Sequence, residues 1–263
     1  MTVDMKLKII IKKEAAILAA LYDLYCPYNP IITSPHIYYL NPEFAKILYI
    51  KYLLEKEDAW DKTFTGILEE KDSNITKTLK SIEIYNWNTI KKMLIKKSKE
   101  ITNLNNEKIK NFKDYSKKIF GFKKYFKEIY LILGFNPIIK ASYGNALTTI
   151  KTHPVISCFT NEKQNPQQIL DVIYHEILHK LIKLNNIKLE EKIEEVIIDQ
   201  MCPKGYLSKL LGLSEKIHEE HLLARQEWLR EEYEKLTGKI KEYFEKQIYN
   251  EKTIFNFLNL KSI

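Results

Sequence analysis

The segment from residue 165 to residue 186 constrains the fold of this chain more than any other. It opens with Asn-Pro, a typical helix start, closes with Asn-Asn, and is apolar almost all round between these ends. A helix of that kind is buried in the folded protein. Its middle nevertheless holds His175, Glu176 and His179. Burial of these groups without a polar partner would be costly, so the segment predicts both a buried helix and a partner for its histidines.

A metal ion is the partner that the spacing favours. Two histidines four residues apart lie one above the other on one helix face, so both imidazoles can bind one ion. Neutral imidazole suits Zn²⁺, and Glu176 is placed to take a proton from water beside it. The string HExxH also arises by chance, but its position inside a buried helix favours function. We predict one Zn²⁺ per chain, with His175 and His179 as ligands and Glu176 as the catalytic base.

A catalytic zinc site needs a third protein ligand and an open fourth position. The stretch EKIEEVIID, residues 191 to 199, offers Glu195 and Asp199 one helical turn apart. Glu195 can bind the ion while Asp199 accepts the free N–H of His175. Glu194 is a rival ligand, because on a helical wheel it lies nearer the apolar side. We prefer Glu195 because Asp199 follows it; the alternative for both glutamates is the charged face of a surface helix.

The HExxH helix followed by an ExxxD helix resembles the gluzincin group of zinc metallopeptidases, which includes the thermolysin-like enzymes and the minigluzincins. The resemblance covers about residues 140 to 201 and rests mainly on residues 175 to 179. It implies a zincin-like core and hydrolysis of peptide bonds in a peptide or protein substrate. It also implies that zinc polarises the scissile carbonyl while Glu176 moves the proton. We expect narrow specificity.

The same resemblance suggests residues that contact the substrate. Asn145-Ala146 lies upstream of His175, where thermolysin-like enzymes carry an Asn-Ala pair on an edge strand that pairs with the substrate backbone. The alternative is that Gly144-Asn145 is only a hairpin turn. In these enzymes a later His or Tyr usually donates to the oxyanion. The candidates are Tyr206, His218, His221 and Arg225.

Two of these candidates have other possible roles. His218 and His221 lie three residues apart and could form a second metal pair. They could equally be exposed residues of a charged helix.

The remaining patterns predict an α+β, mostly helical fold. Residues 137–143 and 146–159 are rich in β-branched and aromatic residues, which indicates a strand, a turn and a strand. We expect a zincin-like core with a small, antiparallel-rich sheet packed on the HExxH helix, flanked by helical N- and C-terminal regions. The expected domains are residues 1–107, 108–206 and 207–263, with the polar run 102–107 as a boundary. The other expected helices are 7–24, 75–101, 108–133, 189–201, 214–237 and 239–258.

The composition leaves a second function open. The net charge is +8, but the lysine pairs are scattered as on solvated helix faces. Three distant cysteines argue against a disulfide framework. No signal peptide or membrane span is expected, so the predicted location is cytoplasmic. The alternative function is a basic helical nucleic-acid-binding or regulatory protein with a structural or degenerate zinc site.

Overall fold

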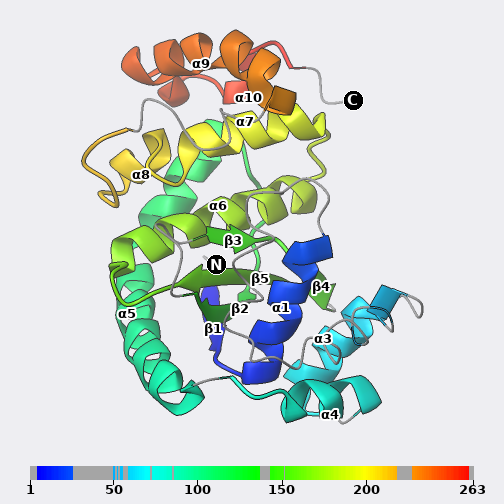
Figure 1. The fold of residues 1–263 in the computed structure, drawn as a ribbon. Helices are drawn as coiled ribbons and strands as arrows, with labels where there is room; N and C mark the ends of the chain where they lie inside the picture. The colour runs from blue at the N-terminus through cyan, green and yellow to red at the C-terminus, as the bar shows by residue number, and fades with distance from the viewer. Residues whose placement is uncertain are drawn as a thin grey trace. The chain divides into compact units, whose positions relative to one another are not determined.

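The chain forms two compact units, each made of segments that are separate in the sequence. The structure is a computed structural model that describes residues 5–25, 50, 52, 54–55, 59–71, 73–84, 86–136, 143–150, 152–217 and 227–260. The sheet unit comprises Lys6–Glu100 and Lys127–Gln164, and the helical unit comprises Met1–Met5, Ile101–Phe126 and Asn165–Ile263. Helices together with one small mixed sheet confirm the predicted α+β, mostly helical class (Figure 1).

The sheet of the sheet unit is mixed, with its strands in the order β1-β2-β5-β3. Its strands are β1 (Lys6–Ile10), β2 (Glu128–Phe135), β3 (Tyr143–Asn145), β4 (Thr149–Ile150) and β5 (His153–Thr160). Strands β1 and β2 are parallel, as are β2 and β5. The short strands β3 and β4 each pair antiparallel with β5. The described pairings within residues 143–160 are antiparallel, as predicted, but the sheet as a whole is mixed, because β1 and β2 add two longer parallel ladders.

Two strands lie where the sequence predicts helix. Strand β1 overlaps the start of the predicted helix 7–24, and β2 overlaps the end of the predicted helix 108–133. The run EIYLILGF of β2 is apolar at nearly every position and mostly buried, so it has no period that separates a strand from a buried helix. Gly134, expected to end a helix, lies inside β2, where a Cβ would come within 2.5 Å of the Phe159 ring.

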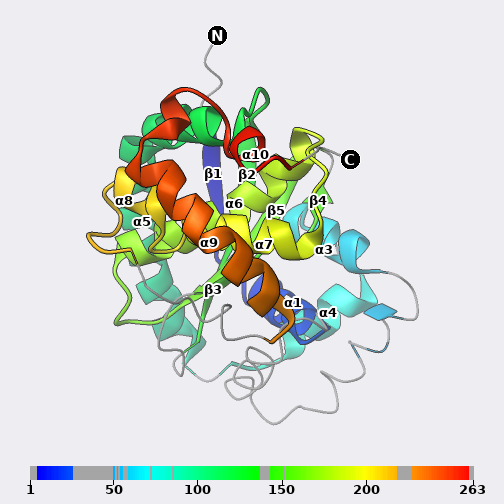
Figure 2. The same cartoon turned by 90° about the horizontal axis from the view of Figure 1, so that it is seen from above.

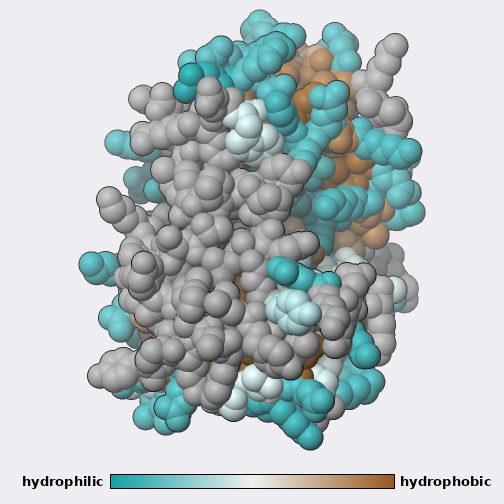
Figure 3. Space-filling view, turned by 45° about the vertical axis from the view of Figure 1, so that its right-hand side comes forward, coloured by the Kyte–Doolittle hydropathy of each residue, from teal (hydrophilic) through white to brown (hydrophobic). Residues whose placement is uncertain are grey.

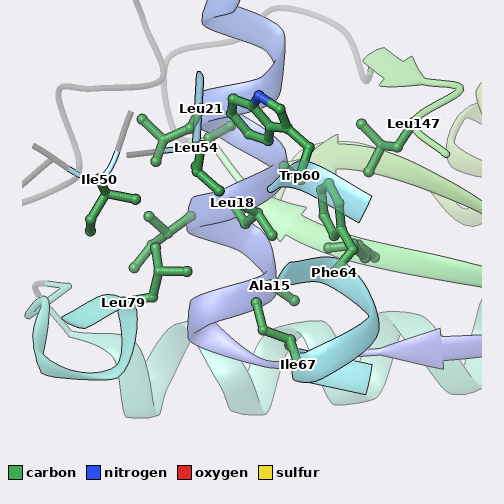
Figure 4. Close-up of a cluster of buried hydrophobic side chains, with 14 of the residues drawn as sticks. Ala15, Leu18, Leu21, Ile50, Leu54, Trp60, Phe64, Ile67, Leu79 and Leu147 are labelled. Atoms are coloured by element: carbon green, nitrogen blue, oxygen red, sulfur yellow. The ribbon is translucent and has the colours of Figure 1, made fainter. Parts of the chain in front are cut away.

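The core of the sheet unit lies among α1 (Lys13–Tyr25), α3 (Trp60–Leu68), α4 (Asn74–Ser81) and one face of the sheet. Helix α1 is apolar all round over residues 15–21, and each of these residues is at most 1% exposed. Figure 4 shows Leu18 beside Trp60 and Phe64 in this cluster. Each buried side chain of this size contributes about 1.5–3 kcal/mol relative to exposure. Packing of this kind fixes α1, α3 and α4 as one body.

Helix α6 belongs to the helical unit and is buried from Ile169 to Ile182. The helices of this unit are α6 (Pro166–Leu184), α7 (Glu191–Met201), α8 (Tyr206–Leu210), η2 (Glu227–Leu229), α9 (Arg230–Glu245), η3 (Ile248–Asn250) and α10 (Ile254–Phe257). Asn165 and Gln168 form a capping box at the start of α6, and Asn185 caps its end. Helix α7 packs against both α6 and α9 (Figure 2). The predicted buried helix between residues 165 and 186 is confirmed.

Helix α5 (Trp87–Phe120) supplies residues to both units. In the helical unit its Phe112 ring stacks on Tyr174 of α6 with centroids 4.2 Å apart. The Tyr174 hydroxyl donates to Asn105 Oδ1 over 3.2 Å. Residues 102–107 continue α5 without a break, and neither unit is a continuous stretch like the predicted regions 1–107, 108–206 and 207–263. The packing of the sheet on α6 stays a prediction.

Apolar side chains are well covered in the part of the chain that the structure describes. There, the large hydrophobic residues that are exposed are Tyr52, at 54%, and Ile95, at 39%. On the face drawn in Figure 3, hydrophilic side chains surround the hydrophobic ones. Among the described helices, none combines the length and hydropathy needed to cross a lipid bilayer.

Candidate metal centre

Helix α6 brings the two histidines of the motif to one face. His175 and His179 are each 8% exposed, and Glu176 between them is 7% exposed. Their rings approach edge to face, with centroids 4.9 Å apart. The Nε2 atoms of the two histidines lie 3.2 Å from each other. The i, i+4 spacing therefore produces the arrangement predicted from helical geometry.

Helix α7 supplies a carboxylate to the same place. Glu195 Oε1 lies 3.6 Å from His179 Nε2. One ligand atom from each of His175, His179 and Glu195 can be chosen so that all three lie within 4.8 Å of one another. Ligand atoms about 2.0–2.1 Å from a tetrahedral ion lie about 3.4 Å apart. The 3.2 Å between the two Nε2 atoms and the 3.6 Å from His179 Nε2 to Glu195 Oε1 are close to that value.

In each histidine Nδ1 is the outer nitrogen and Nε2 the inner one, which faces the other histidine. The hydrogen bond at Nδ1 fixes which nitrogen of the neutral ring carries the hydrogen. His175 donates its Nδ1–H to the backbone carbonyl oxygen of Cys202 over 2.6 Å. His179 donates its Nδ1–H to Glu194 Oε1 over 2.8 Å. In neutral rings both Nε2 atoms then carry lone pairs, and two lone pairs facing each other at 3.2 Å repel. A proton or a metal ion between them removes that repulsion.

The two rival glutamates take different places around His179. Glu194 is bound at the outer nitrogen, Nδ1, whereas Glu195 lies nearer the inner nitrogen, Nε2. Carboxylates at the outer nitrogen of metal-binding histidines orient the ring and raise its basicity. The geometry thus suits Glu195 as the third ligand and Glu194 as the residue that orients His179. The ligand role itself stays a prediction.

The role predicted for Asp199 is filled by another group. The acceptor 2.6 Å from His175 Nδ1 is the carbonyl oxygen of Cys202, not the carboxylate of Asp199. The chain turns back after α7, and this turn carries the Cys202 carbonyl to α6. Asp199 is 1% exposed and acts on Glu195 instead, since its charge adds to burial in raising the pKa of that carboxyl. The sequence could not predict this acceptor, because the spacing of side chains along the chain gives no information about which backbone carbonyl comes close to His175.

The pKa values of the metal-free site are strongly perturbed. Burial and the charge of Glu195 together raise the pKa of Glu176 to about 7, against the opposing charge of His179. Burial alone would lower the pKa of His179. The charge of Glu195, the hydrogen bond to Glu194 and the charge of Glu176 outweigh burial and raise it to about 9. Perturbed acids and bases in a buried cluster are typical of functional sites.

The donor set fits zinc. Two imidazoles and one carboxylate are ligands of borderline character that catalytic zinc sites use. Each imidazole has its outer N–H bonded, which leaves the inner nitrogen to the ion. His175, His179 and Glu195 are therefore the residues that would hold a zinc ion at this site.

The other predicted site residues are less tied to this cluster. Tyr206 begins α8, and its ring stacks on Phe244 with centroids 4.5 Å apart. Gly144 and Asn145 belong to strand β3 rather than to a turn, with Ala146 directly after it. They belong to the sheet unit, so their relation to His175 stays a prediction. His218, His221 and Arg225 lie outside the described residues.

Sequence reasoning missed a group that supports the site. Asp171 and Ser208 hold the turn that carries the Cys202 carbonyl. Pro203 and Gly205 mark that turn in the sequence, but nothing there links it to His175.

Comparison of the chain with protein-family models, with curated proteins and with solved structures found no match. The likeness to gluzincins accordingly rests on the residues of the motif. The functional argument rests on the geometry around His175 and His179.

Proposed function

We propose that this protein is a zinc-dependent metallopeptidase of narrow specificity. His175, His179 and Glu195 hold one zinc ion, and Glu176 acts as the general base. The observation that carries this proposal is the orientation of the two histidines. Each ring is hydrogen-bonded at Nδ1, and the two Nε2 atoms lie 3.2 Å apart. A purely structural zinc site has no need of the buried glutamate that lies between them.

The residues of the site divide the chemistry among them. When bound, zinc supplies a Lewis acid that polarises a carbonyl and makes water more acidic. Glu176 takes the proton of the attacking water and delivers it to the leaving amine, because a base with a pKa near the working pH can do both. Its pKa of about 7 in the metal-free protein supports that role. Glu194 holds the His179 ring in place through Nδ1.

The sheet unit offers a surface suited to an extended peptide. Strand β3 ends the strand order of the described sheet, so no described strand pairs with its outer edge. Backbone hydrogen bonds to such an edge bind peptides with little dependence on sequence. Under the proposal, the backbone of Asn145 and Ala146 takes part in this pairing.

Metal content tests the proposal first. We expect one zinc per purified chain, retained in Glu176→Gln and weakened far more by Glu195→Ala than by Glu194→Ala. Peptide-library cleavage is then measured for the wild type and for Glu176→Gln. The base variant should lose about 10²–10⁴-fold in rate while keeping its zinc.

Two results would overturn the proposal. A wild-type chain that takes up no zinc after reconstitution would remove its basis. A zinc-loaded chain that cleaves no peptide, yet binds DNA or RNA with a steep salt dependence, would replace it with the nucleic-acid-binding alternative.

A further inference from the structure

Asp171 is a buried carboxylate one helical turn before His175 on α6. It is 1% exposed, and both of its oxygens accept hydrogen bonds. The backbone N–H of Lys204 donates to Oδ2 over 2.6 Å, and the Ser208 hydroxyl donates to Oδ1 over 2.5 Å. Burial of a carboxylate is costly without such partners, so the folded chain depends on these two donors to keep Asp171 buried.

Both donors hold the tight turn between α7 and α8, residues 202–205. Ser208 also accepts the backbone N–H of Gly205 over 3.2 Å. Gly205 has no room for a side chain, because a Cβ there would lie 2.3 Å from the carbonyl oxygen of Gln200. The turn is therefore packed directly against the end of α7 and fastened to α6 by Asp171.

The same turn carries the acceptor for His175. The carbonyl oxygen of Cys202, at the start of the turn, lies 2.6 Å from His175 Nδ1. Asp171 and His175 are four residues apart, on one face of α6. Helix α6 thus bonds to the turn through His175 and through Asp171. The bonds of Asp171 hold the turn, and so they set the position of the Cys202 carbonyl that His175 meets.

We propose that Asp171 and Ser208 are positioning residues for the metal centre. They hold the 202–205 turn so that the Cys202 carbonyl keeps His175 in the Nδ1–H tautomer, with Nε2 directed at the ion. The effect on zinc rests on the proposed function, whereas the effect on the tautomer does not. We call the bonds of Asp171 and Ser208 to the 202–205 turn the clamp. A neutral imidazole that exchanges between tautomers carries its hydrogen on Nε2 part of the time and cannot then bind zinc through that atom, so loss of the clamp lowers zinc affinity.

The variants follow from the donor geometry. In Asp171→Asn the amide group can accept only at its oxygen, so either Lys204 N–H or the Ser208 hydroxyl loses its acceptor. Ser208→Ala removes one bond to Asp171 and the bond from Gly205 with little change in volume. Tyr174→Phe is the matched control. It deletes a buried hydrogen bond from the same helix to Asn105, next to His175, and leaves the donors and acceptors of Asp171 and Ser208 unchanged.

The tautomer of His175 is read in the full-length, metal-free chain at about pH 10 by long-range ¹H–¹⁵N correlation with ¹⁵N-labelled histidine. At this pH His179, whose pKa is raised to about 9, has lost the Nε2 proton that would itself hold His175 in the Nδ1–H form at neutral pH. Zinc affinity is then measured by chelator competition. We expect Nδ1–H for His175 in the wild type and Tyr174→Phe, and a mixture of tautomers in Asp171→Asn and Ser208→Ala. Zinc affinity should fall about 10–100-fold in the two clamp variants and stay within about threefold in the control.

The outcomes separate the two proposals. Folded clamp variants with the wild-type tautomer and zinc affinity would overturn the positioning role. If Asp171→Asn does not fold, Ser208→Ala decides the question. A wild-type chain that binds no zinc would overturn the proposed function, while the tautomer of His175 would still decide whether the clamp acts on that ring.

Discussion

Zinc and a proton compete for the inner nitrogen of His179, which makes zinc binding depend on pH in a calculable way. The outer nitrogen of His179 already donates its hydrogen to Glu194. A second proton therefore lies on Nε2, which faces His175 Nε2 at 3.2 Å. This is the place proposed for the ion. With a pKa raised to about 9, His179 holds that proton at neutral pH in the metal-free protein.

The size of the effect follows from this pKa. Below pH 9, each pH unit makes displacement of the proton about tenfold harder, or about 1.4 kcal/mol. Zinc affinity at pH 7 should accordingly be about 100-fold below its limiting value, a difference of about 2.7 kcal/mol. Binding should release one proton from His179 over this range.

Glu194→Gln is the informative perturbation. The glutamine oxygen can still accept the Nδ1–H of His179, but the negative charge that raises the pKa of the ring is gone. The pH at which zinc affinity levels off should move down. The limiting affinity should also fall, by up to about 10–100-fold, because the neutral acceptor makes the ring less basic.

Chelator competition between pH 6 and pH 9.5, at constant ionic strength, measures both quantities. Glu231→Gln is the control, since it removes a carboxylate from the exposed side of α9, where its partner is Lys235. We expect the control to reproduce the wild-type profile. A wild-type affinity that is flat between pH 6.5 and 8.5, or a profile that levels off at the same pH in Glu194→Gln, would refute this account of the site.

Three further predictions concern stability. Gly205→Ala should lower the unfolding free energy by about 1–3 kcal/mol, because its Cβ would meet the backbone of Gln200 at 2.3 Å. Gly238→Ala, whose Cβ would have nothing within 4 Å, should raise the unfolding free energy by about 0.5–1 kcal/mol, and thermal melts compare the two variants directly. The metal-free protein should lose stability, on the order of 3 kcal/mol, as pH rises from 6.5 to about 9, because folded His179 keeps a proton that the unfolded chain releases; urea titrations at several pH values would contradict this if the free energy stayed constant. Leu18→Ala, at a fully buried position of α1, should cost about 2–5 kcal/mol by the same titration, and a cost below 1 kcal/mol would show that the α1 core is loosely packed.

The sheet shows where sequence patterns lose their power. Strands β1 and β2 are short apolar runs next to helices, and such runs look alike in either conformation. Parallel pairing also joins segments far apart in the chain, here Lys6 with Glu128. No local signal specifies such a partner, so the sequence predicted the antiparallel pairing of neighbouring segments and missed the parallel pairing of β1 and β2.

Gly238 illustrates the same difficulty in a helix. It was expected to end a helix, yet α9 continues through it from Arg230 to Glu245. The buried residues Leu236 and Ile240 on either side of it hold the helix in place. Packing of this stripe offsets the weak helical preference of one glycine.

The sequence by itself determined the helix between residues 165 and 186 and the approach of His175 to His179. Both depend only on the pitch of a helix and on local capping by Asn165. Tertiary structure alone decided that Glu194 meets the outer nitrogen of His179, that Glu195 lies nearer the inner one, and that a backbone carbonyl is bonded to His175. These contacts join different segments of the chain, and their geometry is set by how α6, α7 and the following turn pack together.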